Sequence, residues 1–125
     1  MRTTVTSTDA PTAIGPYSQA VKYGGLLWCS GQLGIRSSDG AFVGDDTALQ
    51  AQQALRNLEA ICSEAGTSLG KALRLTIYLV DLADFQAINQ VYATFFESPY
   101  PARATVQVAA LPKGGRVEID AVVAL

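Results

Sequence analysis

The chain has 125 residues, 49% of them hydrophobic and only 16% charged, with a formal net charge of −2. This length suits a single compact domain spanning residues 1–125, and the nine thinly spread lysines and arginines give no electrostatic surface for nucleic acid. Average sequences contain about 25% charged residues. The shortage of charge therefore predicts that part of the surface is buried against other copies of the chain.

The first elements are expected to form a β-hairpin. Gly24–Gly25 separates two apolar runs, which predicts that Tyr17–Tyr23 and Leu26–Gly31 pair as strands across a two-residue turn. A short additional strand is expected at Thr3–Thr6. The stretch Gln32–Gly44 is rich in Gly, Ser and Asp and is predicted to be a loop.

Two amphipathic helices are predicted next, with one strand between them. Apolar residues recur at helical spacing before Gly66, and Asp45–Thr47 can cap the start of this first helix. Alternation over Lys71–Val80 predicts a strand covered on one face, and its inward set is Leu73, Leu75, Ile77 and Leu79. The second helix is expected to begin at Asp84 and to end before Pro99, and its inward set is Phe85, Ile88, Tyr92 and Phe95.

The last stretch, YPARATVQVAALPKGGRVEIDAVVAL, is typical of two apolar strands joined by a Pro/Gly turn. The predicted order is strand, strand, helix, strand, helix, strand, strand. This order predicts an α+β fold in which a mixed sheet of about six strands has both helices on one face. The other face would be covered by a neighbouring subunit.

Arg103 and Glu118 in these last strands are the strongest candidates for chemistry. The chain has no histidine, no acidic cluster with the spacing of a metal site and no phosphate-binding glycine motif, so no metal is expected. An arginine can hold a carboxylate through two parallel hydrogen bonds, and an ionised glutamate can take a proton from water. The structural alternative is an ion pair between neighbouring strands at a subunit boundary.

Four other positions have both a plain and a functional interpretation. Tyr17 can be an interface aromatic or the wall of a pocket. Ser30 and Gly31 can belong to an ordinary turn, or Gly31 can let a ligand approach backbone N–H groups. Asn89 can be a solvated helix residue or can support a site from behind.

The sequence also carries expectations about the cellular compartment. Cys29 and Cys62 form no CxxC pair and are expected to be two small buried side chains. The N-terminus lacks the apolar segment of a secretory signal, and no apolar run approaches the roughly 20 residues of a transmembrane helix. A cytoplasmic location without membrane association is therefore expected.

The segments AIGPYSQA, SGQLG, AQQALRNL, YLVDLADFQAINQVYATFF and above all PARATVQVAALPKGGRVEIDA resemble the Rid/YjgF family of reactive intermediate deaminases. The similarity extends from about Ala10 to Ala121. It implies a chorismate-mutase-like α+β fold, assembled as a homotrimer with a barrel-like core and clefts between subunits. It also implies hydrolysis of enamines and imines, such as 2-aminoacrylate, to a 2-oxo acid and ammonia without a cofactor.

The resemblance further implies roles for individual residues. Arg103 would hold the substrate carboxylate, and Glu118 would activate the water that adds to the imine carbon. Tyr17 would close the cleft from the neighbouring subunit. Many relatives have cysteine where this chain has Thr105, which removes any thiol role but keeps a hydrogen-bonding group. The complete set of implied substrate-binding residues is Arg103, Tyr17, Ser30, Gly31, Asn89 and Thr105.

Three other functions remain open from the sequence. A non-catalytic regulatory trimer could bind 2-oxo acids in the same cleft, keeping Arg103 while tolerating loss of Glu118. A pathway-specific deaminase could act on a larger substrate such as 2-aminomuconate, with Leu33–Gly44 shaping its pocket. A translation inhibitor or endoribonuclease is disfavoured, because the chain lacks histidine and basic patches.

Overall fold

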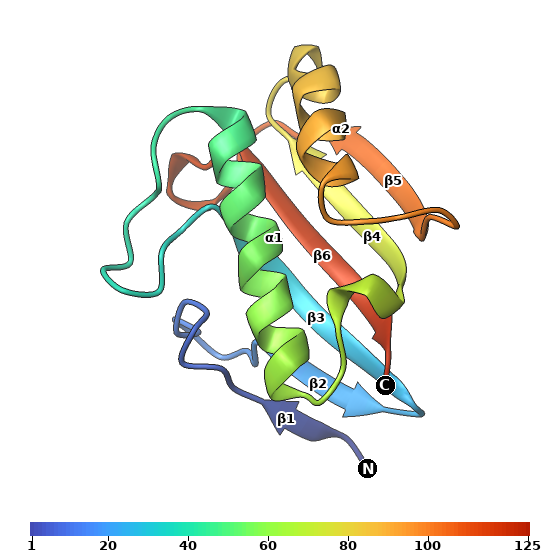
Figure 1. The fold of residues 1–125 in the computed structure, drawn as a ribbon. Helices are drawn as coiled ribbons and strands as arrows, with labels where there is room; N and C mark the ends of the chain where they lie inside the picture. The colour runs from blue at the N-terminus through green and yellow to red at the C-terminus, as the bar shows by residue number, and fades with distance from the viewer.

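Six strands form one mixed sheet, and two helices lie on one of its faces (Figure 1). This computed structural model describes all residues from Met1 to Leu125. The order of strands across the sheet is β1-β2-β3-β6-β4-β5. The elements are β1 (Thr3–Val5), β2 (Ala20–Tyr23), β3 (Leu26–Leu33), α1 (Thr47–Glu64), β4 (Ala72–Leu79), α2 (Phe85–Ala93), β5 (Ala102–Gln107) and β6 (Val117–Ala124).

The last two strands are not neighbours, which corrects the prediction that a tight turn joins them as a pair. Strand β4 lies between them, antiparallel to β6 and parallel to β5. The reason is the helix α2, which connects β4 to β5 as a crossover, and such a connection returns the chain parallel to the strand it left. The segment between β5 and β6 therefore crosses past the end of β4.

The predicted N-terminal hairpin is present, with different limits. Strand β2 begins at Ala20 rather than Tyr17, and β3 continues beyond Gly31 to Leu33. Within β3 the pairing with β6 shifts between Cys29 and Gln32. Two residues of β3, Ser30 and Gly31, therefore lie opposite one residue of β6, which is a β-bulge.

Helix α1 follows its predicted pattern. The carboxylate of Asp46 accepts a hydrogen bond from the N–H of Leu49 at 3.0 Å, which caps the first turn. Gly66, with φ of +86°, lies just beyond the C-terminal end. The buried side of the helix packs against β3 and β6 in the hydrophobic core, where Cys29 and Cys62 are both buried free thiols, as expected.

Helix α2 matches its prediction less closely. Ile88 and Tyr92 are buried, but Phe85 is 38% exposed. Asp84 does not cap α2 with its side chain, because its carboxylate accepts a hydrogen bond from the hydroxyl of Thr47 at 2.7 Å instead. On β4, Leu73 is half-exposed rather than inward, because the β4–β6 pairing shifts between Ala72 and Arg74.

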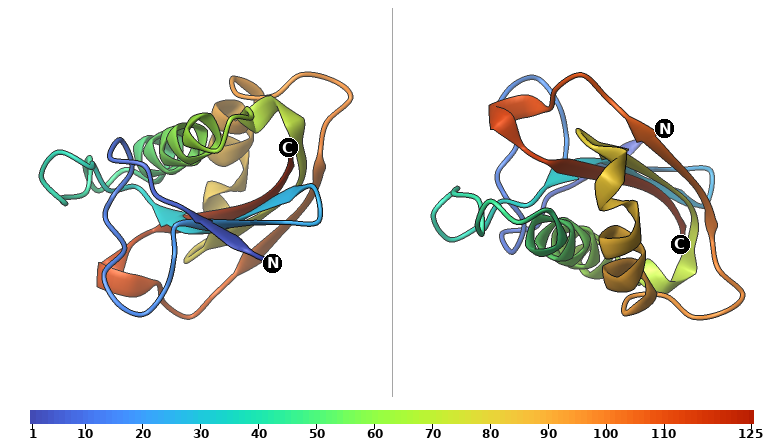
Figure 2. Two further views of the ribbon diagram at one scale, coloured as in Figure 1. Left: turned by 90° about the horizontal axis from the view of Figure 1, so that it is seen from below. Right: turned by 90° about the horizontal axis from the view of Figure 1, so that it is seen from above.

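Both helices lie on the same side of the sheet, and no helix covers the opposite side (Figure 2). On β4 the side chains of Leu75, Ile77 and Leu79 face the helices, whereas Thr76 and Tyr78 face away. We call this second side the open face; it carries Val21, Trp28, Tyr78, Glu118, Asp120 and Val122. Trp28 is 45% exposed there. Neither helix is long and apolar enough to span a membrane.

Candidate functional site

Four of the predicted site residues line one cleft with a volume of about 770 Å³, which we call the Glu118 cleft. Glu118 on β6 faces Gly31 and Ser30 of the β3 bulge, and Tyr17 comes from the segment before β2. The lining also includes Arg36 from the loop after β3 and Lys113 from the turn before β6. The cleft therefore collects residues from three distant parts of the chain.

Gly31 is required by the position of the Glu118 carboxylate. A Cβ atom built on Gly31 would lie 2.5 Å from Oε2 of Glu118 and 2.8 Å from its Cδ. These separations are shorter than carbon–oxygen and carbon–carbon contacts tolerate. The missing side chain therefore makes the space that the catalytic candidate occupies.

Ser30 fixes the segment that carries Tyr17. Its hydroxyl donates a hydrogen bond to the carbonyl of Ser18 at 2.6 Å, and its N–H donates to the carbonyl of Gln19 at 2.9 Å. These two bonds hold the chain beside the bulge although Tyr17 and Ser18 lie outside β2. Ser30 thus supports the wall of the cleft as well as lining it.

Gln19 is a supporting residue that sequence reasoning missed. Its side chain is 2% exposed, and it bonds the N–H of Ser7 at 2.7 Å and the carbonyl of Pro11 at 2.8 Å. Pro11 is part of the cleft wall. A glutamine directly before the apolar start of a predicted strand was the available signal, because a buried amide must find partners.

The carboxyl of Glu118 has a pKa raised above the usual glutamate value. The main cause is burial, which disfavours the charged form, and the negative charge of Asp120 adds to it. Asp120 lies two residues further along β6 on the same face and accepts a hydrogen bond from the hydroxyl of Tyr78 at 2.9 Å. Glu118 has no cationic partner, since the only ion pair of the chain joins Arg36 and Asp39.

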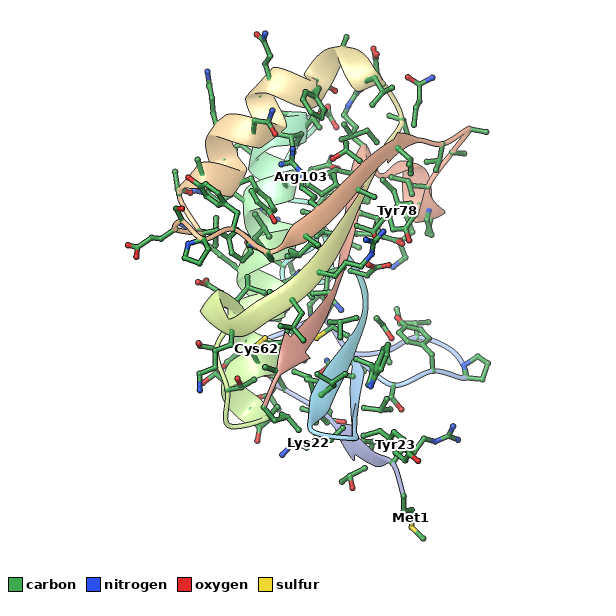
Figure 3. The ribbon with its side chains drawn as sticks, turned by 90° about the vertical axis from the view of Figure 1, so that its right-hand side faces the viewer. Met1, Lys22, Tyr23, Cys62, Tyr78 and Arg103 are labelled. Carbon is green, nitrogen blue, oxygen red and sulfur yellow. The ribbon has the colours of Figure 1, made fainter.

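Arg103 lies elsewhere, between β5 and α2 (Figure 3). Its guanidinium carbon is 4.8 Å from the centre of the Tyr92 ring and 5.6 Å from that of Phe85. Such stacking holds a guanidinium by attraction to the ring face. The guanidinium makes no ion pair within the chain, so an ion pair between Arg103 and Glu118 could form only across a subunit boundary.

Asn89 and Thr105 lie beside Arg103 rather than in the Glu118 cleft. Asn89 follows Phe85 by four residues and precedes Tyr92 by three on α2, so it occupies the helix face that Arg103 contacts. Thr105 is two residues beyond Arg103 on β5 and therefore points to the same side of the sheet. We call Arg103, Asn89 and Thr105 the Arg103 group.

The Arg103 group and the Glu118 cleft lie on opposite faces of the sheet. Arg103 pairs with Leu75 of β4, whose side chain faces the helices, whereas Glu118 pairs with Tyr78 of β4, which faces away. Figure 3 shows the labelled Arg103 and Tyr78 on different sides of the strands. The expectation that Arg103 and Glu118 occupy adjoining strands is therefore wrong, and strand β4 separates them.

Sequence reasoning also missed the aromatic support of Arg103 and the acid beside Glu118. Phe85 and Tyr92 were assigned to the core, although their seven-residue spacing on α2 is also suited to flank a side chain at the sheet edge. Asp120 alternates with Glu118 in VEID, and this spacing was a readable signal. No group of three His, Cys, Asp or Glu side chains is placed to hold a metal ion.

Comparisons with known proteins place this architecture in a family. Residues 7–125 match the family described as "Endoribonuclease L-PSP". A RutC family protein, y4sK, from Sinorhizobium fredii is 53% identical over 121 residues, covering 97% of this chain and 96% of the relative. The 2-iminobutanoate/2-iminopropanoate deaminase of Bos taurus is 46% identical over 122 residues, covering 98% of this chain and 89% of that protein.

Solved structures agree with the sequence matches. The crystal structure of the Rid-family protein YyfA from Yersinia pestis superposes with a TM-score of 0.97 at 38% identity, covering 100% of both chains. The six-stranded mixed sheet with two helices on one face is thus the YjgF-type α+β fold. The chain belongs to the Rid/YjgF family, as the resemblance of its motifs predicted.

Proposed function

We propose that this protein hydrolyses 2-imino acids and their enamine tautomers, of the 2-aminoacrylate type, to 2-oxo acids and ammonia. Relatives 44–46% identical over nearly the whole chain are named 2-iminobutanoate/2-iminopropanoate deaminase. The observation that carries the proposal is the Glu118 carboxyl, which is half-buried in a cleft, lies against Gly31 and has no cationic partner.

The complete site requires a second copy of the chain. One sheet cannot bring Arg103 and Glu118 to the same small molecule, because they project from opposite faces. The open face exposes apolar side chains including Trp28, and Arg103 lies on the edge strand β5, so both surfaces are available to neighbours. We therefore infer a homotrimer in which Arg103, Asn89 and Thr105 of one subunit meet Tyr17, Ser30, Gly31 and Glu118 of the next.

The residues of such a site divide the chemistry between them. The Arg103 guanidinium binds the substrate carboxylate through parallel hydrogen bonds, and its stacking on Tyr92 limits its orientations. Glu118 takes a proton from a water molecule while the water oxygen adds to the carbon of the protonated imine, giving a neutral carbinolamine. Glu118 then gives this proton to the nitrogen and takes the proton of the new hydroxyl as the carbon–nitrogen bond breaks, so that ammonia leaves and the C=O bond forms. Transfer of that last proton to the departing ammonia gives ammonium and restores the ionised Glu118.

The position of Glu118 favours a catalyst over a 2-oxo-acid sensor. A sensor needs only the cation that binds the anionic ligand, and a second carboxylate near that ligand would repel it. A buried carboxyl with a raised pKa exchanges protons closer to neutral pH than an exposed one. Positioned acid–base catalysis of this kind contributes about 10²–10⁴-fold to a rate.

A coupled assay tests the proposal. A serine dehydratase generates 2-aminoacrylate in situ, and the release of pyruvate is followed with and without this protein. Wild-type protein should accelerate release, Glu118→Ala should lower kcat by about 10²–10⁴-fold, and Arg103→Ala should mainly raise KM. Absence of acceleration by the wild type, together with clear binding of pyruvate, would identify a sensor instead.

The loop after β3, which lines part of the Glu118 cleft, supports a second candidate function with a longer substrate. Arg36, Ser37 and Gly40 of the loop after β3 reach the cleft, so the chain leaves room beyond a three-carbon substrate. A deaminase for a longer imino acid, such as 2-aminomuconate, is the second candidate. Comparison of kcat/KM for 2-iminopropanoate and a longer 2-imino acid decides between them.

A further inference from the structure

Two buried hydroxyl groups near Arg103 have no hydrogen-bond partner in the protein. They are the phenolic oxygen of Tyr92 and Oγ1 of Thr105. Tyr92 as a whole is only 6% exposed. A buried polar group without a partner costs about 1–3 kcal/mol, so two of them in one place indicate a site that another molecule completes.

The three groups lie on the same side of β5. The Tyr92 ring is 4.8 Å from the guanidinium carbon of Arg103, and Thr105 follows Arg103 by two residues on the strand, a separation of about 7 Å. The guanidinium also lacks an ion-pair partner. Three unpaired polar groups therefore gather in one small region at the edge of the sheet.

The chemistry of these groups defines what fits them. A guanidinium can only donate hydrogen bonds, and each hydroxyl can donate one. Burial raises the pKa of Tyr92 more than the charge of Arg103 lowers it, so the phenol keeps its proton at neutral pH. The complement of several donors around a positive charge is an anion with several acceptor lone pairs, and a carboxylate provides them.

We propose that the Tyr92 hydroxyl, together with the Thr105 hydroxyl from the same side of β5, donates a hydrogen bond to the substrate carboxylate that Arg103 holds. Tyr92 then has two functions, since its ring supports the guanidinium and its hydroxyl binds the same ligand. This inference rests on the proposed role of Arg103 as the carboxylate-binding residue. It adds Tyr92, a residue that the helical pattern assigned to the core, to the substrate-binding set.

The variant Tyr92→Phe isolates the hydroxyl, because it keeps the ring under Arg103. The dissociation constant of pyruvate is measured by calorimetry, and KM and kcat by the pyruvate-release assay. Loss of a hydrogen bond to a charged group should weaken pyruvate binding roughly 10-fold to 100-fold. KM should rise similarly with little change in kcat, because the carboxylate is bound equally before and during the reaction.

Two controls make the result specific. Tyr23→Phe removes an exposed hydroxyl on β2, far across the sheet from β5, and should leave binding unchanged. Methyl pyruvate lacks the carboxylate, so wild type and Tyr92→Phe should bind it equally. Thr105→Val should weaken pyruvate binding as well, in the same direction as Tyr92→Phe.

The melting temperature without ligand separates this role from a structural one. Because the hydroxyl of Tyr92 has no protein partner, Tyr92→Phe should melt at the wild-type temperature or above it, with unchanged oligomer mass. A lower melting temperature or a changed mass would show that the hydroxyl contacts another copy of the chain, and would overturn the proposal.

Failure of this inference is distinguishable from failure of the proposed function. Wild-type acceleration of pyruvate release, with equal KM and equal pyruvate affinity in Tyr92→Phe, overturns the role of the hydroxyl and leaves the deaminase intact. If the wild type does not accelerate release, the calorimetric comparison of pyruvate and methyl pyruvate still decides whether Tyr92 contacts a carboxylate.

Discussion

Arg103 and Glu118 project from opposite faces of one sheet, with strand β4 between the strands that carry them. Arg103 is held between aromatic rings on the helix side, and Glu118 lies against Gly31 on the open face. A molecule of three or four carbons cannot contact both within one chain. The two residues can therefore cooperate only if different copies supply them, and this condition can be tested directly.

Mixing two inactive variants should restore activity. In the proposed homotrimer, Arg103→Ala and Glu118→Ala alone should each have little activity at a substrate concentration well below the raised KM of Arg103→Ala, whereas a mixed trimer has one boundary with both side chains intact. Random mixing of equal amounts in a cyclic trimer should recover about a quarter of the wild-type rate. The measurement is pyruvate release after co-expression or co-refolding, with the double variant as the control. Activity that stays at the level of the separate variants would contradict a shared site.

Gly31→Ala should inactivate the protein without unfolding it. The added methyl would collide with the Glu118 carboxylate, and the flexible side chain would move away rather than the strand. A displacement of about 1 Å can cost about 10²-fold in rate, so a fall in kcat/KM of that order is expected. Gly70→Ala is the matched control, because its new Cβ would lie 3.8 Å from the nearest atom, Oγ of Ser68.

The rate should depend on pH through Glu118. A general base must be ionised, and burial and Asp120 raise the pKa of this carboxyl. The acidic limb of the kcat/KM profile should therefore lie above the usual glutamate range. In Asp120→Asn the limb should move to lower pH, since a negative charge beside Glu118 is removed. A profile without an acidic limb above the usual glutamate range would exclude Glu118 as the titrating group.

The raised pKa of Glu118 should also make the stability of the protein depend on pH. The free energy of unfolding should fall as the pH rises, whereas the rate should increase. The folded state keeps the Glu118 proton to a higher pH than the unfolded state does, so it binds more protons between the two pKa values. The contribution of Glu118 to the free energy of unfolding is therefore greatest below its pKa in the unfolded state. This contribution is lost as the pH rises through its pKa in the folded state. Glu118→Gln should remove this decline, which urea denaturation at several pH values measures.

Asn57 should anchor the loop wall of the cleft. This residue is fully buried on α1, and its side-chain N–H groups donate to the carbonyls of Leu33 at 3.2 Å and Ile35 at 3.0 Å. Asn57→Ala should destabilise the protein by about 2–4 kcal/mol, because one buried and one partly buried carbonyl lose their partner. Urea denaturation measures the effect, and exposed Arg56→Ala should change stability by no more than about 0.5 kcal/mol.

The helices and most strands of this fold could be predicted from the sequence, but the order of the strands in the sheet could not. The repeat from Ala51 to Ala65 and the cap at Asp46 fixed α1, because both signals act within a few residues. The pairing of β4 with both β5 and β6 joins residues far apart in the chain, and the apolar runs at the C-terminus fit several arrangements. The helix between β4 and β5 was the unused clue, since a crossover requires parallel strands.

The sequence predicted which residues belong to the site, but it did not predict how these residues are arranged in space. Glu118, Gly31, Ser30 and Tyr17 do share a cleft, but their contact depends on the shift of register in β3, which alternation of polar and apolar residues does not reveal. Arg103 was singled out for its charge. Its aromatic support could not be predicted, because Phe85 fits an inward helical stripe equally well.

The bulge at Ser30–Gly31 adds one residue to β3 while the pairing with β6 continues on both sides of it. Before it, Leu27 and Cys29 point to the helices; after it, Gln32 does, so the parity of β3 is inverted at this point. Deletion of a single codon within the bulge would restore strict alternation and leave Gln32 on the helix side, because one residue of β3 would then lie opposite one residue of β6. The extra residue therefore serves the cleft rather than the strand, since it lets both Ser30 and Gly31 line the space around Glu118.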